Sequence, residues 1–350
     1  MKAWILNKTK YLNNSNSKIP DVNQKNMPDA SNNESHNMEL KLENINLDSH
    51  RNKNNIYKVI LCGICKTDAK ICTTGHRDLT LPRIPGHEIC VEDENGQTYA
   101  VWPGNACGKC LLCKQNLENL CKKMQITGFH NDGGFSPFIQ LNKNSLVKIP
   151  ENIPISSAVF AEPLACAVNA IEQLSGNLSN KSIVIIGGGV CGLLTALAAN
   201  FYGLKTTIIE NSSAKQNKIK KALSYINCQL NSSNKDSFDF AINATSNINA
   251  LLSSMEYLKP SGTLIFFSGI TNSTTISAKL FNEIHYRQLT IKGAYGCRKN
   301  NIKQAINIME NNNDFFSSIT EKYIKHKDVK ENIYKVLTGK YLRFIIDYRL

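Results

Sequence analysis

The sequence lacks an apolar run long enough to cross a membrane. A spanning helix needs roughly 20 predominantly apolar residues, and the best candidate, residues 158–171, contains Glu162. The apolar stretch near the N-terminus, residues 3–6, is also shorter than the apolar region of a secretory signal. We therefore expect a soluble, cytoplasmic protein with no membrane partner.

Aromatic residues are few, at 8% of the chain, and they are not interleaved with the basic residues. Lysine and arginine number 41 against 28 acidic residues, which gives a net charge of +13 and suits an anionic partner. Single-stranded nucleic acid is bound by aromatic side chains set among basic ones, and scattered lysines do not form such a surface. We expect no nucleic-acid partner, and an anionic cofactor accounts for the charge equally well.

The remaining composition, 42% hydrophobic over 350 residues, is sufficient for a buried core divided between two domains. Strand-like segments dominate as far as residue 155. They are residues 1–6, 39–47 and 56–60, followed by a hairpin over residues 89–102 that turns at Asn95 and Gly96. Residues 11–38 are rich in asparagine and poor in large apolar residues, so we predict a disordered insertion there.

After Pro150 the pattern changes to alternating helices and apolar strands. A helical run over residues 156–174 precedes a strand at residues 182–186, and further apolar strands are predicted at residues 238–243, 263–268 and 289–293. This alternation is typical of a doubly wound parallel sheet. The last 50 residues contain helical patterns at residues 302–309 and 329–337, then an apolar strand at residues 342–346 that we expect to return to the first domain.

Four of the twelve cysteines lie within one short loop: Cys107, Cys110, Cys113 and Cys121. Their spacing, C-x2-C-x2-C-x7-C, allows four thiolates to surround one tetrahedral zinc ion at about 2.3 Å. An iron–sulfur cluster is the alternative, but the bacterial ferredoxin pattern has its fourth cysteine three residues after the third, followed by proline. The spacing therefore favours a closed, structural zinc site.

A second set of metal-ligand types lies upstream. Cys62 and Cys65 come before His87 and Glu88, and a cysteine, a histidine and a carboxylate are ligands of catalytic zinc. Such a site keeps one coordination position open for water or substrate. The residues alone leave open which cysteine takes part.

Three nearby side chains have both a functional and an ordinary interpretation. Asp68 can accept the second ring N–H of His87 or cap a helix. Thr67 can carry a proton or be a solvated hydroxyl. Glu162, which precedes Pro163 at the start of a helical run, either reaches the same metal ion or is an exposed first-turn glutamate.

A glycine-rich loop follows the strand at residues 182–186. Gly187, Gly189 and Gly192 form G-x-G-x-x-G between a strand and a helix, the context in which this motif binds a dinucleotide. The predicted cofactor-binding residues of the loop are these three glycines and Val190, at the start of the helix that faces the pyrophosphate.

The next strand ends in Glu210, 23 residues after Gly187. A carboxylate there binds the adenosine ribose hydroxyls and repels a 2′-phosphate, which predicts NAD in preference to NADP. Lys215 is either a second residue beside this ribose or an exposed helix lysine.

Together these motifs resemble the zinc-dependent medium-chain alcohol dehydrogenase family, especially its sorbitol-type polyol and threonine dehydrogenase branches. The resemblance covers about residues 39–350 and includes Glu162-Pro163. It implies a GroES-like, mostly-β catalytic domain from both chain ends and a central Rossmann coenzyme domain. The domains are then residues 1–155, 156–297 and 298–350.

The resemblance also implies individual roles. Cys65, rather than Cys62, and His87 are zinc ligands, with Glu88 or Glu162 as the carboxylate beside the ion. Thr67 relays the substrate proton, and Lys66 lies near the cofactor phosphates. Lys70 stands where many members have the histidine that completes the relay, so the exit of the proton is not predicted.

We expect an enzyme that moves a hydride between a small secondary alcohol of the polyol type and NAD. It is expected to contain one catalytic and one structural zinc per chain and to form a homodimer or homotetramer, as the resemblance implies. One alternative is a threonine-type amino-alcohol dehydrogenase. The other is a non-catalytic protein that binds zinc and NAD.

Overall fold

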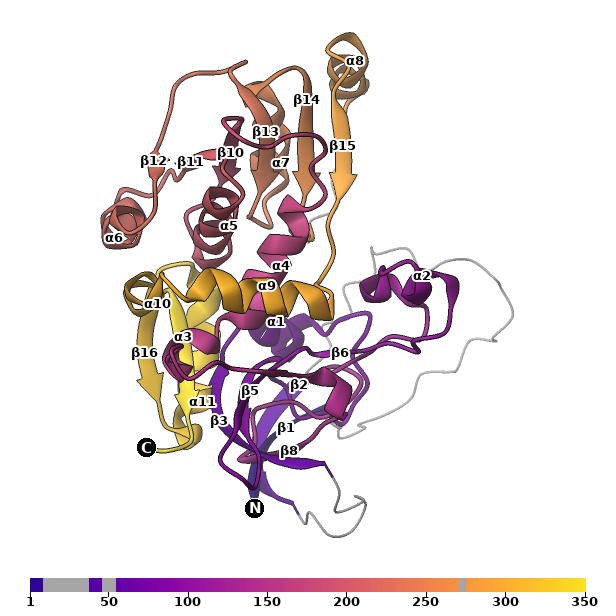
Figure 1. Ribbon diagram of the computed structural model, residues 1–350, viewed down its shortest axis with the longest axis vertical. Helices are drawn as coiled ribbons and strands as arrows, with labels where there is room; N and C mark the ends of the chain where they lie inside the picture. The colour runs from indigo at the N-terminus through magenta and orange to yellow at the C-terminus, as the bar shows by residue number, and fades with distance from the viewer. Residues whose placement is uncertain (9–37, 46–54, 271–274) are drawn as a thin grey trace, which may run out of the picture.

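The computed structural model describes residues 1–8, 38–45, 55–270 and 275–350. It contains a six-stranded sheet and a seven-stranded sheet, with helices α4 (Ala161–Ile171) and α9 (Lys299–Met309) between them (Figure 1). The predicted insertion lies outside the described residues, apart from Met38 at the start of a strand. Across the described residues, no helix combines the length and apolar character needed to cross a bilayer.

The seven-stranded sheet joins the two ends of the chain. Its order is β16-β17-β3-β4-β5-β9, and β8 also pairs with β3. The strands are β3 (Ile56–Gly63), β4 (Glu88–Glu92), β5 (Thr98–Val101), β8 (Phe138–Gln140), β9 (Leu146–Lys148), β16 (Thr320–Ile324) and β17 (Arg343–Asp347). Because β17 pairs antiparallel with β3, the predicted C-terminal strand does return to the first sheet.

Two small ladders accompany this sheet, and one predicted hairpin lies within it. The ladders pair β1 (Lys2–Lys8) with β2 (Met38–Asn44) and β6 (Gly104–Asn105) with β7 (Gln125–Ile126). The hairpin pairs β4 with β5 and turns at Gly96, whose φ of 79° favours glycine. The sequence-predicted turn is therefore confirmed.

The six-stranded sheet is parallel throughout, in the order β12-β11-β10-β13-β14-β15. Read along the chain this is the 3-2-1-4-5-6 order of a doubly wound dinucleotide-binding sheet, which confirms the predicted α/β fold class. The strands are β10 (Ser182–Ile186), β11 (Lys205–Ile209), β12 (Cys228–Leu230), β13 (Phe238–Asn243), β14 (Leu258–Phe266) and β15 (Thr290–Gly293).

The helical run predicted over residues 156–174 is wrong as a single helix. The structure divides it into α3 (Ile155–Ala158) and α4, which begins only at Ala161. Pro163 lacks an N–H and its ring clashes with the carbonyl four residues earlier, so proline is tolerated in the first turn of a helix but not in its interior. The break therefore places Glu162 in the first turn of α4.

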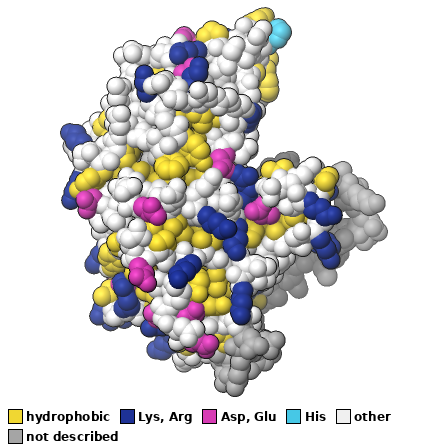
Figure 2. Space-filling model, viewed as in Figure 1, with side chains coloured by type: hydrophobic (Ala, Val, Ile, Leu, Met, Phe, Trp, Pro, Cys, Tyr) yellow, Lys and Arg dark blue, Asp and Glu magenta, His cyan; other side chains and the backbone are white. Residues whose placement is uncertain are grey.

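The other helices cover the sheets or connect them. They are α1 (Lys66–Thr74), α2 (Leu111–Lys114), α5 (Val190–Phe201), α6 (Ser213–Ser224), α7 (Ile248–Ser254), α8 (Ala278–Tyr286), α10 (Asn313–Ile319) and α11 (Val329–Ile333). On the face shown in Figure 2, basic side chains lie in separate groups among polar and apolar ones.

One core of buried side chains connects the two sheets. It runs from Leu61 and Trp102 to Ile185 in β10. Between them lie Phe160, directly before α4, and Phe316 in α10. The rings of Phe160 and Phe316 are 5.5 Å apart, and neither side chain is exposed. Apolar burial at this junction stabilises the position of one sheet relative to the other.

Replacing Phe160 by alanine should therefore destabilise the whole molecule. We expect F160A to lower the free energy of unfolding by about 3–5 kcal/mol, since it removes buried area and leaves a cavity. Denaturant unfolding of F160A measures this loss. The matched control is F281A, because Phe281 is 59% exposed; its effect should stay within about 0.5 kcal/mol. Equal effects of the two substitutions would contradict the proposed core.

Candidate active site

The four cysteines of the predicted zinc loop come together in the structure. Sulfur–sulfur distances are 3.5 Å between Cys110 and Cys113, 3.6 Å between Cys121 and Cys107, and 3.9 Å for both Cys107–Cys113 and Cys110–Cys121. Four sulfurs about 2.3 Å from a tetrahedral zinc ion would be about 3.8 Å apart. The donor set therefore fits a closed structural zinc site.

Backbone amides prepare one of these thiols for metal binding. The N–H groups of Lys109 and Cys110 hydrogen-bond to the Cys107 sulfur and lower the pKa of this thiol to about 6. Thiolate is the form of cysteine that ligates metal. The loop also contacts the segment that precedes α9, where the side chain of Asn119 donates to the carbonyl of Tyr295 at 2.8 Å.

The second predicted set also converges, on the first turn of α1 and the start of β4. Cys65, His87 and Glu88 offer ligand atoms that all lie within 4.8 Å of one another. Asp68, which is fully buried, accepts a hydrogen bond from the backbone N–H of Cys65 at 2.8 Å. Its other oxygen lies 3.1 Å from Nδ1 of His87, so Nε2 of the imidazole is left for a ligand.

Glu88 is 1% exposed, and neither of its carboxylate oxygens has a hydrogen-bond partner among the described residues. Arg343 in β17 places Nη2 3.0 Å from Oε1 of Glu88 as an ion pair, and its Nη1 donates to the carbonyl of Ile64 at 2.7 Å. A buried carboxylate without hydrogen bonds is costly. Arg343 compensates the charge at Oε1, and Oε2, which has no ion-pair or hydrogen-bond partner among the described residues, suits a metal ion.

The charges around Cys65 favour its thiolate. Burial alone raises the pKa of Cys65, but the hydrogen bond and charge of His87 and the charge of Arg343 outweigh it and lower the pKa to about 7. Burial lowers the pKa of His87, yet the charge and hydrogen bond of Asp68 leave it well above the ordinary value. These charges therefore favour the thiolate of Cys65, the form that ligates metal.

Glu162 groups with two other cysteines. Ligand atoms of Glu162, Cys166 and Cys297 all lie within 4.8 Å of one another. Burial raises the pKa of Glu162, and the charge of His87 partly offsets this rise. The structure thus removes much of Glu162 from solvent instead of exposing it at a helix start, and the charge of Glu162 still acts on Glu88.

The glycine-rich loop has the geometry that a bound dinucleotide requires. Gly187 has a φ of 105°, and a Cβ at Gly192 would collide with the carbonyl oxygen of Gly187. Gly189 has open space where a Cβ would point, and it precedes Val190 at the first position of α5. Backbone approach to a pyrophosphate needs this space. Gly188 had no predicted role, and its missing side chain makes room for Ile219.

Glu210 contacts the glycine-rich loop directly. Its carboxylate accepts hydrogen bonds from the backbone N–H groups of Gly188 at 3.0 Å and Ser212 at 2.9 Å. Nζ of Lys215 lies 3.2 Å from the same carboxylate. Burial raises the pKa of Glu210, but these N–H groups and Lys215 outweigh it and lower the pKa, so the group is ionised.

Charge interactions extend from the metal-ligand set and α1 toward the coenzyme domain. Burial, followed by the negative charge of Cys65, raises the pKa of Cys191 to about 12, which places the start of α5 within electrostatic reach of Cys65. Partial burial and the charges of Lys70 and Lys215 lower the pKa of Lys66. Lys66 in α1 and Lys215 in α6 therefore approach each other, and half-buried Thr67 lies between Lys66 and Asp68 in the chain.

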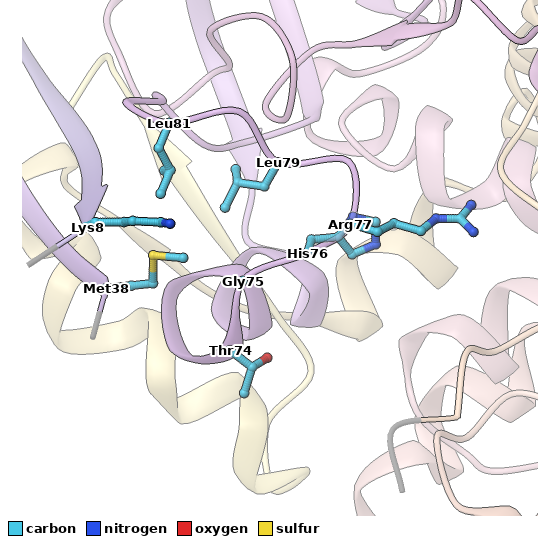
Figure 3. Close-up of a pocket in the computed structure, with 8 residues that line it drawn as sticks. All are labelled: Lys8, Met38, Thr74, Gly75, His76, Arg77, Leu79 and Leu81. Carbon is cyan, nitrogen blue, oxygen red and sulfur yellow. The ribbon is translucent and has the colours of Figure 1, made fainter. Parts of the chain in front are cut away.

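A separate cavity of about 390 Å³ lies beyond the other end of α1 (Figure 3). Lys8, Met38, Leu79 and Leu81 reach toward it, whereas Arg77 extends away from it. None of the predicted site residues lines it. The predicted site residues therefore lie apart from this cavity.

Comparison with known proteins agrees with this geometry. Residues 53–151 match the model of the alcohol dehydrogenase GroES-like domain. This match and the polyol and threonine dehydrogenase relatives support the zinc-type medium-chain alcohol dehydrogenase family for this chain. Residues 182–248 of this dehydrogenase match an FAD binding domain model; NAD and FAD proteins share the G-x-G-x-x-G unit, so this match identifies the dinucleotide loop without distinguishing the cofactor.

The similarity to individual relatives covers between about half and most of this chain. D-altritol 5-dehydrogenase of Agrobacterium fabrum is 28% identical over 281 residues, which cover 75% of this chain and 83% of that protein. L-threonine 3-dehydrogenase of Pyrococcus furiosus is 32% identical over 180 residues, 47% of this chain and 51% of that protein. A Sinorhizobium meliloti protein described as a zinc-binding dehydrogenase, crystallised with NADP, has the same fold, with a TM-score of 0.78 at 20% identity over 88% of this chain and 96% of that chain.

Sequence reasoning missed two features of this dehydrogenase. Arg343 lies in an apolar C-terminal strand, where a charge is expected to be buried only if it is paired. An arginine in such a strand is therefore the signal that could have predicted a buried ion pair. Cys166 follows Glu162 by four residues, the spacing that puts two side chains on one face of a helix. Cys297 has no comparable signal, because it reaches this group only through the fold.

Asp68 offers a direct test of the arrangement. We expect D68N to weaken zinc binding at the Cys65 set by about 10–100-fold, as loss of a carboxylate behind a histidine ligand does. Competition with a chelator, followed by metal analysis, measures the affinity. E94Q is the control, since Glu94 is exposed and remote from the ligands. Equal zinc affinity in D68N and the wild type would show that Asp68 does not position the ligands.

Proposed function

We propose that this dehydrogenase oxidises a secondary alcohol of the polyol type to a ketone, with NAD as hydride acceptor. The observation that carries the proposal is the convergence of Cys65, His87 and Glu88, and the charge of Cys65 also acts on Cys191 in the first turn of α5. The similarity to D-altritol 5-dehydrogenase supports a polyol as the substrate class.

In this proposal Cys65, His87 and a carboxylate hold zinc at an open site. Zinc supplies Lewis acidity toward the alcohol oxygen. Asp68 keeps the ring of His87 in one orientation and one tautomer, because its oxygen lies at hydrogen-bond distance from Nδ1. Arg343 balances the charge of Glu88 and of Cys65, so that a buried set of anionic ligands is tolerated.

Thr67 is our candidate for removing the substrate proton. It lies on the first turn of α1, two residues after Cys65 and next to Asp68. A hydroxyl both donates and accepts a hydrogen bond, so it can take a proton from an alcohol while passing its own proton on. The route beyond Thr67 stays unassigned, because Lys70 replaces the expected histidine.

The cofactor is proposed to be NAD, bound by the loop from Gly187 to Gly192. Glu210 would accept hydrogen bonds from the ribose hydroxyls and repel a 2′-phosphate. Lys66 and Lys215, which approach each other from α1 and α6, would provide positive charge for the anionic cofactor. The domain limits at residues 155 and 297 and the homodimer or homotetramer remain part of the same proposal.

A threonine-type substrate is the second candidate, favoured by the 32% identity to L-threonine 3-dehydrogenase over half of that protein. An amino-alcohol acid needs partners for an ammonium group and a carboxylate. Turnover of a panel of polyols and of threonine, measured as the rise in NADH absorbance, separates the two candidates.

Loss of the Cys65 thiolate should abolish turnover without loss of the coenzyme site. We expect kcat/KM of C65S to fall by about 1,000-fold or more, since roughly 4 kcal/mol of transition-state stabilisation disappears with the metal. NADH binding, followed by fluorescence, should be unchanged. C228S, at a half-buried cysteine in β12, is the control and should keep full turnover. Wild-type activity in C65S would rule out the proposed mechanism.

Glu210 should determine the choice of coenzyme. In E210Q the ratio of kcat/KM with NADP to that with NAD is expected to rise by about tenfold or more, because the repulsion of the 2′-phosphate is removed. Steady-state kinetics with both coenzymes measure this ratio, with E94Q as the control. An unchanged ratio would mean that Glu210 only stabilises the loop through Gly188 and Ser212.

A further inference from the structure

Glu162, Cys166 and Cys297 form a compact group of one carboxylate and two thiols. One ligand atom from each lies within 4.8 Å of the other two. The thiol of Cys166 donates a hydrogen bond to Oε1 of Glu162 at 3.3 Å, and the thiols of Cys166 and Cys297 are themselves hydrogen-bonded. The mechanism proposed above uses neither cysteine.

The backbone holds these three residues in place. Glu162 and Cys166 share one face of α4 because they are four residues apart. The carbonyl of Cys297 accepts a hydrogen bond from the buried indole N–H of Trp102 at 2.9 Å. One residue earlier, the carbonyl of Gly296 accepts from the side chain of Asn169, also on α4, at 3.0 Å. The segment that carries Cys297 is therefore fixed against the helix that carries Cys166.

We propose that Glu162, Cys166 and Cys297 bind a thiophilic divalent cation of the zinc class, without using Cys65, His87 or Glu88 as a ligand. Two thiolates select soft or borderline metals over magnesium and calcium, and a carboxylate oxygen completes a three-ligand set with one position open. Binding releases the two thiol protons and replaces the hydrogen bonds between the three groups by metal–ligand bonds.

This position shares one residue with the proposed catalytic site. A cation at Cys166 and Cys297 fixes the Glu162 carboxylate on their side. Glu88 is then the carboxylate that remains beside Cys65 and His87. The proposal thus goes beyond alcohol oxidation, and it predicts which of the two glutamates belongs to which ion.

Cadmium is a suitable probe, because each cadmium–thiolate bond adds ultraviolet absorbance and the ion occupies zinc sites. The full-length protein, with its zinc exchanged for cadmium, should contain three ions and seven cadmium–thiolate bonds per chain, from the four-cysteine loop, Cys65 and the Cys166–Cys297 pair. In the double variant C166S/C297S we expect two ions and five such bonds. C228S, at a cysteine outside all three groups, should match the wild type.

Folding of C166S/C297S is checked by cooperative thermal unfolding. If the double variant does not fold, the single variants C166S and C297S replace it, and each should lose one cadmium–thiolate bond. Cadmium NMR of the wild type provides a measurement without substitution and should show a resonance for a two-sulfur site besides that of the four-sulfur loop. Wild-type cadmium content in folded C166S/C297S would overturn the proposal. A disulfide between Cys166 and Cys297 in protein purified under reducing conditions would also overturn it.

The same titration separates this proposal from the proposed function. C65S should lose one ion while the Cys166–Cys297 position stays filled. If C65S instead retained every ion and C166S/C297S lost one, the catalytic assignment would fail and the additional metal position would stand.

Discussion

One buried carboxylate, that of Asp68, holds together the part of the molecule on which the chemistry depends. One of its oxygens accepts the backbone N–H of Cys65, and the other lies at hydrogen-bond distance from the ring of His87. These ligand candidates come from segments separated by more than twenty positions in the sequence. Because Asp68 contacts both segments, a single side chain holds the backbone of Cys65 next to the ring of His87. The same contact leaves Nε2 of the ring available for a ligand.

The charge of this group is balanced from the far end of the chain. Arg343 reaches Glu88 and the carbonyl of Ile64 from β17, so the C-terminal strand contributes a cation as well as a sheet edge. Removing either member of a buried ion pair leaves the other uncompensated. The pairing of β17 with β3 is therefore a condition for the active site, and not only for the fold.

Motifs that are contiguous in the sequence could be predicted well, and contacts between distant segments could not. The four-cysteine loop, the glycine-rich loop and the hairpin at Gly96 each have a spacing that determines their own local geometry. The contact between Asp68 and His87 was one of two predicted interpretations, and the structure shows it together with the other, the cap on the N–H of Cys65. Arg343 was missed because no local pattern shows which carboxylate a distant cation will meet. The run over residues 156–174 was read as one helix because its apolar pattern continues through Val159 and Phe160. The break lies there because Pro163 is tolerated only in the first turn of a new helix.

The central claim is that Cys65 and His87, positioned by Asp68, clasp one zinc ion next to the start of α5. Anomalous diffraction collected on both sides of the zinc absorption edge, from crystals of the full chain, tests it most directly. The account predicts an anomalous peak bonded to Sγ of Cys65 and Nε2 of His87, in addition to the peak within the four-cysteine loop. A map with the loop peak alone, at full zinc supply and with Asp68 still in contact with His87, would contradict it.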